Sequence, residues 1–158
     1  MDKEAYERKE KVILRVPYTE RYQALKKEKE QLKEIEIPTP ECYQHKLKKR
    51  MQPNQCFVES IKFARDCREA IYCIGQFQRS DFLHAWIEFE DQDYCFDGTL
   101  QAFYPKEKYY KYRGVKKLYM RTAAEITQLS NKHEFYGIYP EDWQKVKSLL
   151  VSSSSWKL

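Results

Sequence analysis

The chain of 158 residues is long enough for one globular domain with a substantial core, and its 34% of charged and 15% of aromatic residues exclude a disordered protein. A net charge of +5 permits an acidic partner without requiring one. No apolar run approaches the ~18 residues of a membrane span. The odd number of cysteines, five, includes no CxxC pair and follows no signal peptide, so we expect free thiols in a reducing, cytoplasmic compartment.

Residues 1–40 are expected to form an N-terminal accessory element. Residues 11–16 contain several branched aliphatic side chains, which predicts a strand that ends at Pro17. Thr19 can cap a helix that runs to about Glu34, whose thin apolar stripe and many charges are typical of a solvated face, with a docking helix as the alternative. Residues 37–40, Ile-Pro-Thr-Pro, then form a stiff connector. We therefore divide the chain into this element at 1–40, a core at 41–151 and a tail at 152–158.

Two basic stretches are candidate binding surfaces. Residues 45–50 could meet phosphate or an acidic protein, although a solvated surface is the simpler interpretation. Residues 106–113 interleave aromatic and cationic side chains, which can stack bases and hold phosphates, although a Tyr-rich loop bordering a cleft is again simpler. The residues of this second stretch that we expect to engage an acidic partner or nucleic acid are Lys106, Lys108, Tyr109, Tyr110, Lys111 and Tyr112.

Residues 84–99 predict a β-hairpin, because two aromatic-rich segments flank an acidic turn at 90–93. If residue 89 or 90 pairs with 94 or 93, Trp86 lies opposite Asp97 and His84 opposite Thr99. His84 and Asp97 then share one face of the hairpin as diagonal neighbours, close enough for the carboxylate to reach the imidazole. A slip of one residue would place them on opposite faces.

Upstream of the hairpin, a helical pattern runs from Phe57 to about Ala70. Asn54 is a suitable N-cap, which places Cys56 in the first turn. Free backbone N–H groups and the helix dipole favour a thiolate there. Each residue alone is more often structural, since free Cys is commonly a small buried hydrophobe and Asp before Gly is ordinary turn chemistry. The ordered set Cys56, His84 and Asp97 nevertheless follows the pattern of an activated thiol nucleophile.

The order of these segments resembles the transglutaminase-like branch of the papain-like cysteine-enzyme superfamily. The Cys begins a helix, residues 71–75 form a strand that contains a Gly, His84-Ala85-Trp86 opens the next strand, and Asp97-Gly98-Thr99 closes the last. Gly98 stands where Pro is common in that branch, and the resemblance covers about residues 53–104. It implies an acyl-enzyme intermediate that is resolved by water, as in a peptidase or deamidase, or by an amine, as in a transglutaminase.

In the implied mechanism, His84 takes the thiol proton of Cys56 and Asp97 orients the imidazole. The oxyanion donors would be the Cys56 N–H and a side-chain amide, for which Gln55 and Asn54 are the candidates, while Trp86 would shield the site. No metal or other cofactor is needed, and a zinc site of Cys and His lacks the paired spacing that such sites show. The alternative function is a non-catalytic protein of the same fold that binds a protein or nucleic acid through its basic, Tyr-rich surface.

The remaining segments complete an α+β pattern, in which one helix bearing the nucleophile packs on an antiparallel sheet, as in a papain-like or transglutaminase-like core. We expect strands at 71–77, 115–121 and 134–139 and a turn at 78–81. Thr122 and Glu125 form a capping box for a helix to about Asn131, and Pro140 starts a last helix to about Val151.

Overall fold

The computed structural model describes residues 2–77, 82–134 and 137–152. In these ranges the chain forms six α-helices, one 3₁₀ helix and five strands. Their bounds are α1 Lys3–Leu14, α2 Tyr18–Leu32, η1 Glu41–Lys46, α3 Cys56–Arg65, β1 Ala70–Phe77, β2 Leu83–Phe89, β3 Tyr94–Asp97, β4 Ala102–Pro105, α4 Lys106–Arg113, β5 Val115–Thr122, α5 Ala123–Lys132 and α6 Pro140–Ser152.

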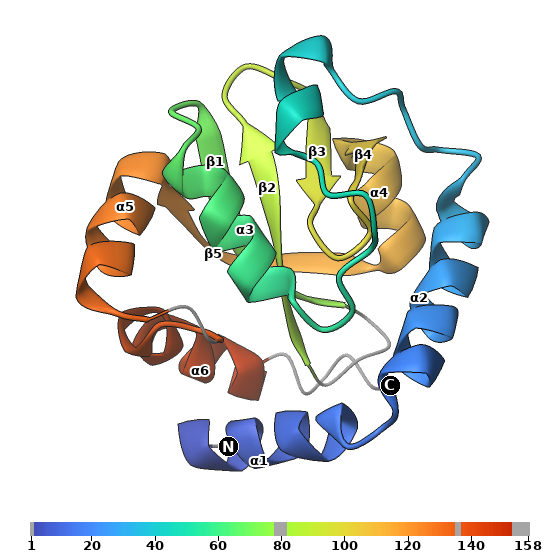
Figure 1. The fold of residues 1–158 in the computed structure, drawn as a ribbon. Coiled ribbons are helices and arrows are strands. Elements are labelled where there is room, and N and C mark those ends of the chain that lie inside the picture. Colours follow the sequence, from blue (N-terminus) through green and yellow to red (C-terminus); the bar gives the residue numbers. More distant parts are fainter. Residues whose placement is uncertain (1, 78–81, 135–136, 153–158) are drawn as a thin grey trace.

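The five strands form one antiparallel sheet in the order β4-β3-β2-β1-β5. The strands β1, β2 and β3 each pair with the next strand along the chain, and β5 returns to the free edge of β1. This arrangement confirms the α+β class and the antiparallel sheet. The helix α3 lies across β1 and β2 (Figure 1).

The sheet is covered on both faces, because side chains alternate along each strand. On one face, Ala85 and Ile87 of β2 join a core with helices α1, α3, α5 and α6. On the other face, Trp86 joins a second core, to which α2 contributes Leu25 and α4 contributes Tyr109. The sheet is therefore the middle layer of three.

The N-terminal segment differs from the prediction, because residues 11–14 continue a helix and do not form a strand. Asp2 caps α1 by accepting a hydrogen bond from the Ala5 N–H, and Tyr6 anchors the helix in the first core with only 1% of its surface exposed. The branched side chains that suggested a strand, Val12 and Leu14, remain exposed. A capped helix with one buried anchor thus outweighs local β propensity here.

Both helices before the Pro connector supply buried side chains to the cores. Tyr6 packs at a tilt beside Trp143 of α6, with ring centroids 5.4 Å apart, and its hydroxyl accepts a hydrogen bond from the Leu83 N–H. Leu25 and Leu32 of α2 are buried in the second core. These contacts favour residues 1–36 as an integral part of the fold and not as a removable element.

The other predicted elements compare with the structure as follows. The strands at β1 and β5, the capping box of α5 and the start of α6 at Pro140 are confirmed. The helix α3 ends at Arg65, not near Ala70, because the chain turns tightly there with N–H···O bonds from 67 to 64 and from 70 to 67. Residues 134 and 137–139 are not in a strand, and residues 78–81, 135–136 and 153–158 lie outside the described ranges.

None of the helices in the described ranges is both long enough and apolar enough to cross a membrane.

The buried position of Tyr6 predicts a large effect on stability. Tyr6→Ala removes a side chain that is 1% exposed and should lower the free energy of unfolding by about 3 kcal/mol, the usual cost of truncating a buried aromatic residue. Tyr18→Ala, at a tyrosine that is 49% exposed, is the matched control and should change it by less than about 1 kcal/mol. Urea denaturation followed by circular dichroism measures both. Equal effects would show that α1 is peripheral.

Candidate active site

A tight turn places Cys56 at the first position of α3. The Gln55 N–H donates to the Gln52 carbonyl oxygen across Pro53 and Asn54, and Asn54 has a φ of 62°. Pro second and a left-handed Asn third are typical of a type II turn. The turn is fixed to the sheet because the Gln52 N–H donates to the Thr99 carbonyl oxygen at 2.8 Å. Cys56 is itself half-buried.

The predicted N-cap role of Asn54 is wrong. The left-handed backbone of Asn54 places it outside the helix, Gln55 occupies the N-cap position, and no side chain caps α3. The Asn54 side-chain oxygen instead accepts a hydrogen bond from Arg21 of α2 at 3.0 Å, which leaves the Asn54 NH₂ group as a donor. Within the described residues, the first backbone bond of the helix comes from the Glu59 N–H, so the Cys56 N–H has no backbone acceptor there.

The hairpin has the register that the sequence predicts. Ile87 pairs with Phe96 and Glu88 pairs with Cys95, which places His84 and Asp97 on one face. The Nε2 atom of His84 and the Oδ2 atom of Asp97 are 3.0 Å apart. Asp97 is fully buried and the His84 side chain is 12% exposed, so the imidazole lies between a buried carboxylate and the partly open Cys56.

The Asp97 carboxylate is held on both of its oxygens. Oδ1 accepts three hydrogen bonds from the two residues after Gly98: from the N–H of Thr99 at 2.9 Å, from its hydroxyl at 2.6 Å, and from the N–H of Leu100 at 3.1 Å. Such saturation fixes the carboxylate plane, because every lone pair on Oδ1 faces a donor. Asp97 therefore presents Oδ2 in one fixed direction.

Oδ2 accepts from side chains of two other elements. Besides His84, the Tyr109 hydroxyl donates to it at 2.6 Å and the Arg113 Nη1 at 3.2 Å, both from α4. The second guanidinium nitrogen of Arg113 pairs with Glu28 of α2. Burial alone would raise the pKa of the Asp97 carboxyl, but His84 and Arg113 outweigh it and hold that pKa well below its usual range. Asp97 thus stays ionised at neutral pH.

The imidazole of His84 is tuned by its neighbours in the same way. Burial disfavours the imidazolium, but the Asp97 charge and hydrogen bond, together with a hydrogen bond to Cys56, raise the pKa of His84 to about 9. Because Nε2 faces Asp97, Nδ1 is the nitrogen left to exchange a proton with the Cys56 thiol. The aromatic ring of Phe77 lies 4.4 Å from the imidazole centroid and covers it. The three predicted residues Cys56, His84 and Asp97 are therefore brought together.

Gly98 allows α3 to approach the segment that carries Asp97. A Cβ atom at Gly98 would lie 2.6 Å from the Glu59 Cβ of α3, which is closer than real contacts allow. Glu59 follows Cys56 by one helical turn, so a side chain at position 98 would push the nucleophile-bearing helix off the hairpin. Gly98 therefore lets this helix pack directly against the turn.

Trp86 lies beneath the site in the second core. Its ring is fully buried, 6.3 Å from His84 and nearly parallel to it, and its Nε1–H donates to Glu88 at 3.0 Å. Gly75 leaves room for it, since a Cβ there would lie 2.7 Å from the Trp86 ring. Trp86 therefore supports His84 from the protein interior. Of the amides expected near the oxyanion, Gln55 directly precedes Cys56 with a half-buried side chain, and Asn54 is exposed.

The Tyr-rich stretch is a helix, α4, and not the loop that its composition suggested. Tyr109 is fully buried on Asp97, and the Tyr110 hydroxyl donates to Glu88 on the same face of the sheet. The buried Tyr109 ring is therefore unavailable to stack bases, whereas Tyr110 is half-buried with its hydroxyl engaged. The members of the stretch that reach the surface are Lys108, Lys111 and Tyr112, which are exposed, and Lys106, which is half-buried.

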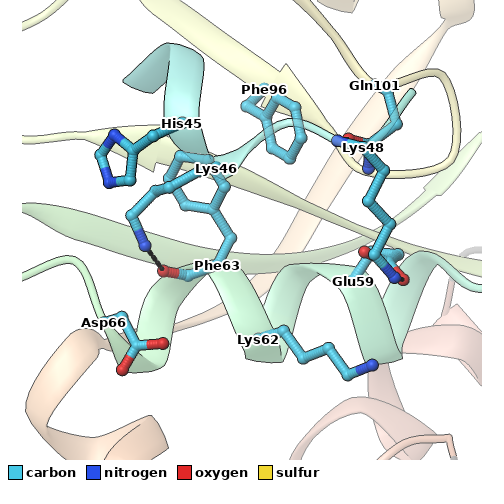
Figure 2. Close-up of a pocket in the computed structure, with 9 residues that line it drawn as sticks. All are labelled: His45, Lys46, Lys48, Glu59, Lys62, Phe63, Asp66, Phe96 and Gln101. Carbon is cyan, nitrogen blue, oxygen red and sulfur yellow. Dashed lines mark hydrogen bonds and ion pairs between the residues drawn. The ribbon is translucent and has the colours of Figure 1, made fainter. Parts of the chain in front are cut away.

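A hollow of 340 Å³ lies between residues 45–48 and one face of α3 (Figure 2). Two of the lysines that line it bind other groups of the same lining. Lys46 Nζ donates to the Phe63 carbonyl oxygen at 3.3 Å, and Lys48 Nζ pairs with Glu59 (Figure 2). Within the described ranges, no group of three or more His, Cys, Asp and Glu residues could hold a metal ion.

Comparison with protein-family models, with curated proteins and with solved structures finds no match for this chain.

The elevated pKa of His84 gives a direct pH test. The folded pKa of about 9 lies above the ordinary value of 6.5, so the His84–Asp97 pair stabilises the folded state fully below pH 6.5 and less as the pH rises through about 9. The His84 ring protons should titrate in NMR spectra with a midpoint near 9. In Asp97→Asn the midpoint should fall, because the largest favourable charge is lost. A midpoint near 6.5 in the wild-type protein would contradict this geometry.

The close approach at Gly98 gives a second test. Gly98→Ala should displace α3 from the hairpin and lower both the stability and the reactivity of Cys56, measured by urea denaturation and by thiol alkylation. Gly137→Ala is the comparison, since nothing lies within 4 Å of its Cβ position although its φ of 86° makes the substitution strained. Both variants should lose stability, but Gly137→Ala should leave the reactivity of Cys56 intact. Equal reactivity of the two variants would contradict the role of Gly98.

Proposed function

We propose that the protein is a thiol-nucleophile acyl-transfer enzyme that acts on an amide or peptide bond of a protein or peptide. One observation carries the proposal: Cys56, His84 and Asp97 come from three separate elements and meet at one place, where His84 is hydrogen-bonded to the buried Asp97 carboxylate and interacts with the half-buried Cys56. Nucleophilic catalysis by a thiol requires this order of groups, with the carboxylate innermost, the imidazole in the middle and the nucleophile outermost. It also supports the papain-like or transglutaminase-like core as a proposal for the fold family.

In the first step, the proton of the Cys56 thiol passes to His84, whose raised pKa favours the imidazolium, and the resulting thiolate attacks the carbonyl carbon of the substrate. The carbonyl π electrons move to oxygen, and the Cys56 N–H is placed to donate to that oxyanion, together with the NH₂ group of Asn54 or Gln55. The tetrahedral intermediate then collapses, the carbon–nitrogen bond breaks, and His84 returns its proton to the leaving amine. A thioester on Cys56 remains.

In the second step, a nucleophile attacks the thioester carbon and His84 accepts its proton. The carbon–sulfur bond then breaks, which releases the acyl product and regenerates the Cys56 thiolate. Water as the nucleophile gives hydrolysis or deamidation, and an amine gives transamidation. Throughout both steps Asp97 keeps Nε2 of His84 in place, because its other contacts hold the carboxylate in one position. Arg113 keeps Asp97 ionised when His84 is neutral, since its own charge does not titrate.

The other cysteines provide matched controls for Cys56. Burial raises the pKa of the Cys67 thiol to about 11 and raises that of the Cys73 and Cys95 thiols still further. Cys42 is exposed and reports ordinary thiol reactivity. Cys56 should therefore be alkylated by iodoacetamide at neutral pH faster than Cys42, measured by peptide mass spectrometry in one reaction.

The loss of activity on substitution should depend on the role of each residue, with the nucleophile and the base mattering most. Cys56→Ala should lower the rate of acyl transfer by several orders of magnitude while the protein stays folded. Cys67→Ala should leave that rate unchanged and lower the free energy of unfolding by only about 1 kcal/mol. His84→Ala should resemble Cys56→Ala, and Asp97→Asn should cost less, because orientation is lost but the base remains. Each variant would be incubated with an unfolded protein and a primary amine. New N-termini would report hydrolysis, released ammonia alone deamidation, and incorporated amine transamidation.

Two results would contradict this function. Alkylation of Cys56 no faster than that of Cys42, and unaffected by His84→Ala, would show that the thiol is not activated. A cellular function retained in Cys56→Ala would show that the protein acts by binding, with the exposed residues Lys108, Lys111 and Tyr112 as the candidate contacts. The cytoplasmic location and an acidic partner remain predictions.

A further inference from the structure

Two arginines lie beside the turn that leads into Cys56. The Arg21 Nη1 donates to the side-chain oxygen of Asn54, two residues before Cys56, and its Nε donates to the Val16 carbonyl oxygen. The guanidinium of Arg21 also lies over the ring of Tyr18, 5.6 Å from its centroid. These contacts hold one cation at a fixed place next to the nucleophile.

Arg50, from the segment that precedes the turn, completes the same surface. Its guanidinium lies over the Tyr22 ring, 5.3 Å from the centroid, and the rings of Tyr22 and Tyr18 are 6.1 Å apart. Arg50 is exposed, and Tyr18 is 49% exposed. The surface thus consists of Tyr18, Arg21, Tyr22 and Arg50, and the N-terminal end of α2 provides the first three.

The base of this surface is rigid. The residue after Arg50, Met51, is 7% exposed in the second core, and the next backbone N–H, that of Gln52, is bound to the Thr99 carbonyl oxygen. Arg50 is therefore attached to a segment that is itself fixed to the active-site hairpin. A ligand bound here would be held at a defined distance from Cys56.

The two cations lack a carboxylate partner in the described part of the chain, unlike the other structural arginines. Arg113 is neutralised by Asp97 and Glu28, and Arg121 by Asp142 and Glu125. Arg21 and Arg50 contact only neutral oxygens and aromatic rings. Stacking fixes the planes of their guanidinium groups, whose N–H forks match carboxylate geometry. Their positive charge remains for a ligand.

We infer that Arg21 and Arg50, held over Tyr18 and Tyr22, recognise an acidic segment of the peptide substrate whose carbonyl group acylates Cys56. The inference rests on the proposed function and assigns its substrate class. The two residues from Asn54 to Cys56 span at most ~7 Å of backbone, so acidic side chains within a few residues of the attacked amide are in range. An acidic segment is thereby selected over a neutral or basic one.

The test uses peptides that label the nucleophile. Three pentapeptide amides carry an N-terminal chloroacetyl group and are identical except for residues 2 and 3, which are Asp-Asp, Asn-Asn or Lys-Lys. The Cys56 thiolate displaces chloride and forms a thioether, and the rate is followed by mass spectrometry. The Asp-Asp peptide should react roughly fivefold faster than the Asn-Asn peptide at low salt, as two exposed ion pairs would give. The advantage should shrink at high salt.

The variants separate this inference from the proposed function. The ratio of the Asp-Asp rate to the Asn-Asn rate should fall to near one in the double variant Arg21→Gln, Arg50→Gln. The single variant Arg50→Glu should react fastest with the Lys-Lys peptide. Arg8→Gln, at an exposed arginine on α1, should keep the wild-type ratio. Each rate is divided by the rate of Cys56 with iodoacetamide in the same variant, so a change in thiol reactivity cancels.

Three results would overturn the inference. A wild-type ratio near one, with Cys56 still rapidly alkylated by iodoacetamide in a His84-dependent manner, would overturn it and leave the proposed function intact. A ratio that survives the double Arg→Gln variant would place acidic recognition elsewhere and overturn it in the same way. A Cys56 that iodoacetamide does not label faster than Cys42 would overturn the proposed function and this inference with it.

Discussion

The buried carboxylate of Asp97 is the constraint on which the rest of the structure depends. It accepts three hydrogen bonds on each oxygen, from the chain that follows it, from His84 on β2 and from two side chains of α4. An unpaired carboxylate in this position would cost several kcal/mol, so the folded state needs all of these elements in place. The positions of the hairpin and of α4 are thus fixed by one charge.

The same constraint explains why both faces of the sheet take part in the site. Cys56 packs against the first core through α3, whereas His84 and Trp86 share the face of the second core. Two glycines make the meeting possible, one where α3 approaches the hairpin at Gly98 and one where Trp86 crosses β1 at Gly75. The Arg113–Glu28 pair extends the network to α2, which also carries Arg21, one of the two arginines beside the turn that leads into Cys56. Helix α2 therefore contacts the active site both through Arg113 and through Asn54.

The sequence predicted the features that depend on short range. Alternation and a four-residue turn were enough to fix the register of the hairpin and the shared face of His84 and Asp97. The contacts of Tyr109 and Arg113 with Asp97 were missed because composition suggested a loop. The available signal was the spacing of four residues between Tyr109 and Arg113, which places both side chains on one face of a helix, followed by Gly114 as a typical helix terminator. In the structure Gly114 has the left-handed φ of 61° that such a terminator adopts. The place of Tyr6 next to Leu83 had no such signal, because 77 residues separate the two.

The most direct test of the account is whether Cys56 forms an acyl-thioester. The protein would be mixed with p-nitrophenyl acetate, and the acetylated residues would be mapped by mass spectrometry before and after treatment with hydroxylamine. The account predicts that Cys56 is acetylated faster than the exposed Cys42, that this acetyl group is removed by hydroxylamine, and that His84→Ala removes the difference between the two thiols. Acetylation of Cys42 and surface lysines, with Cys56 unmodified, would contradict it.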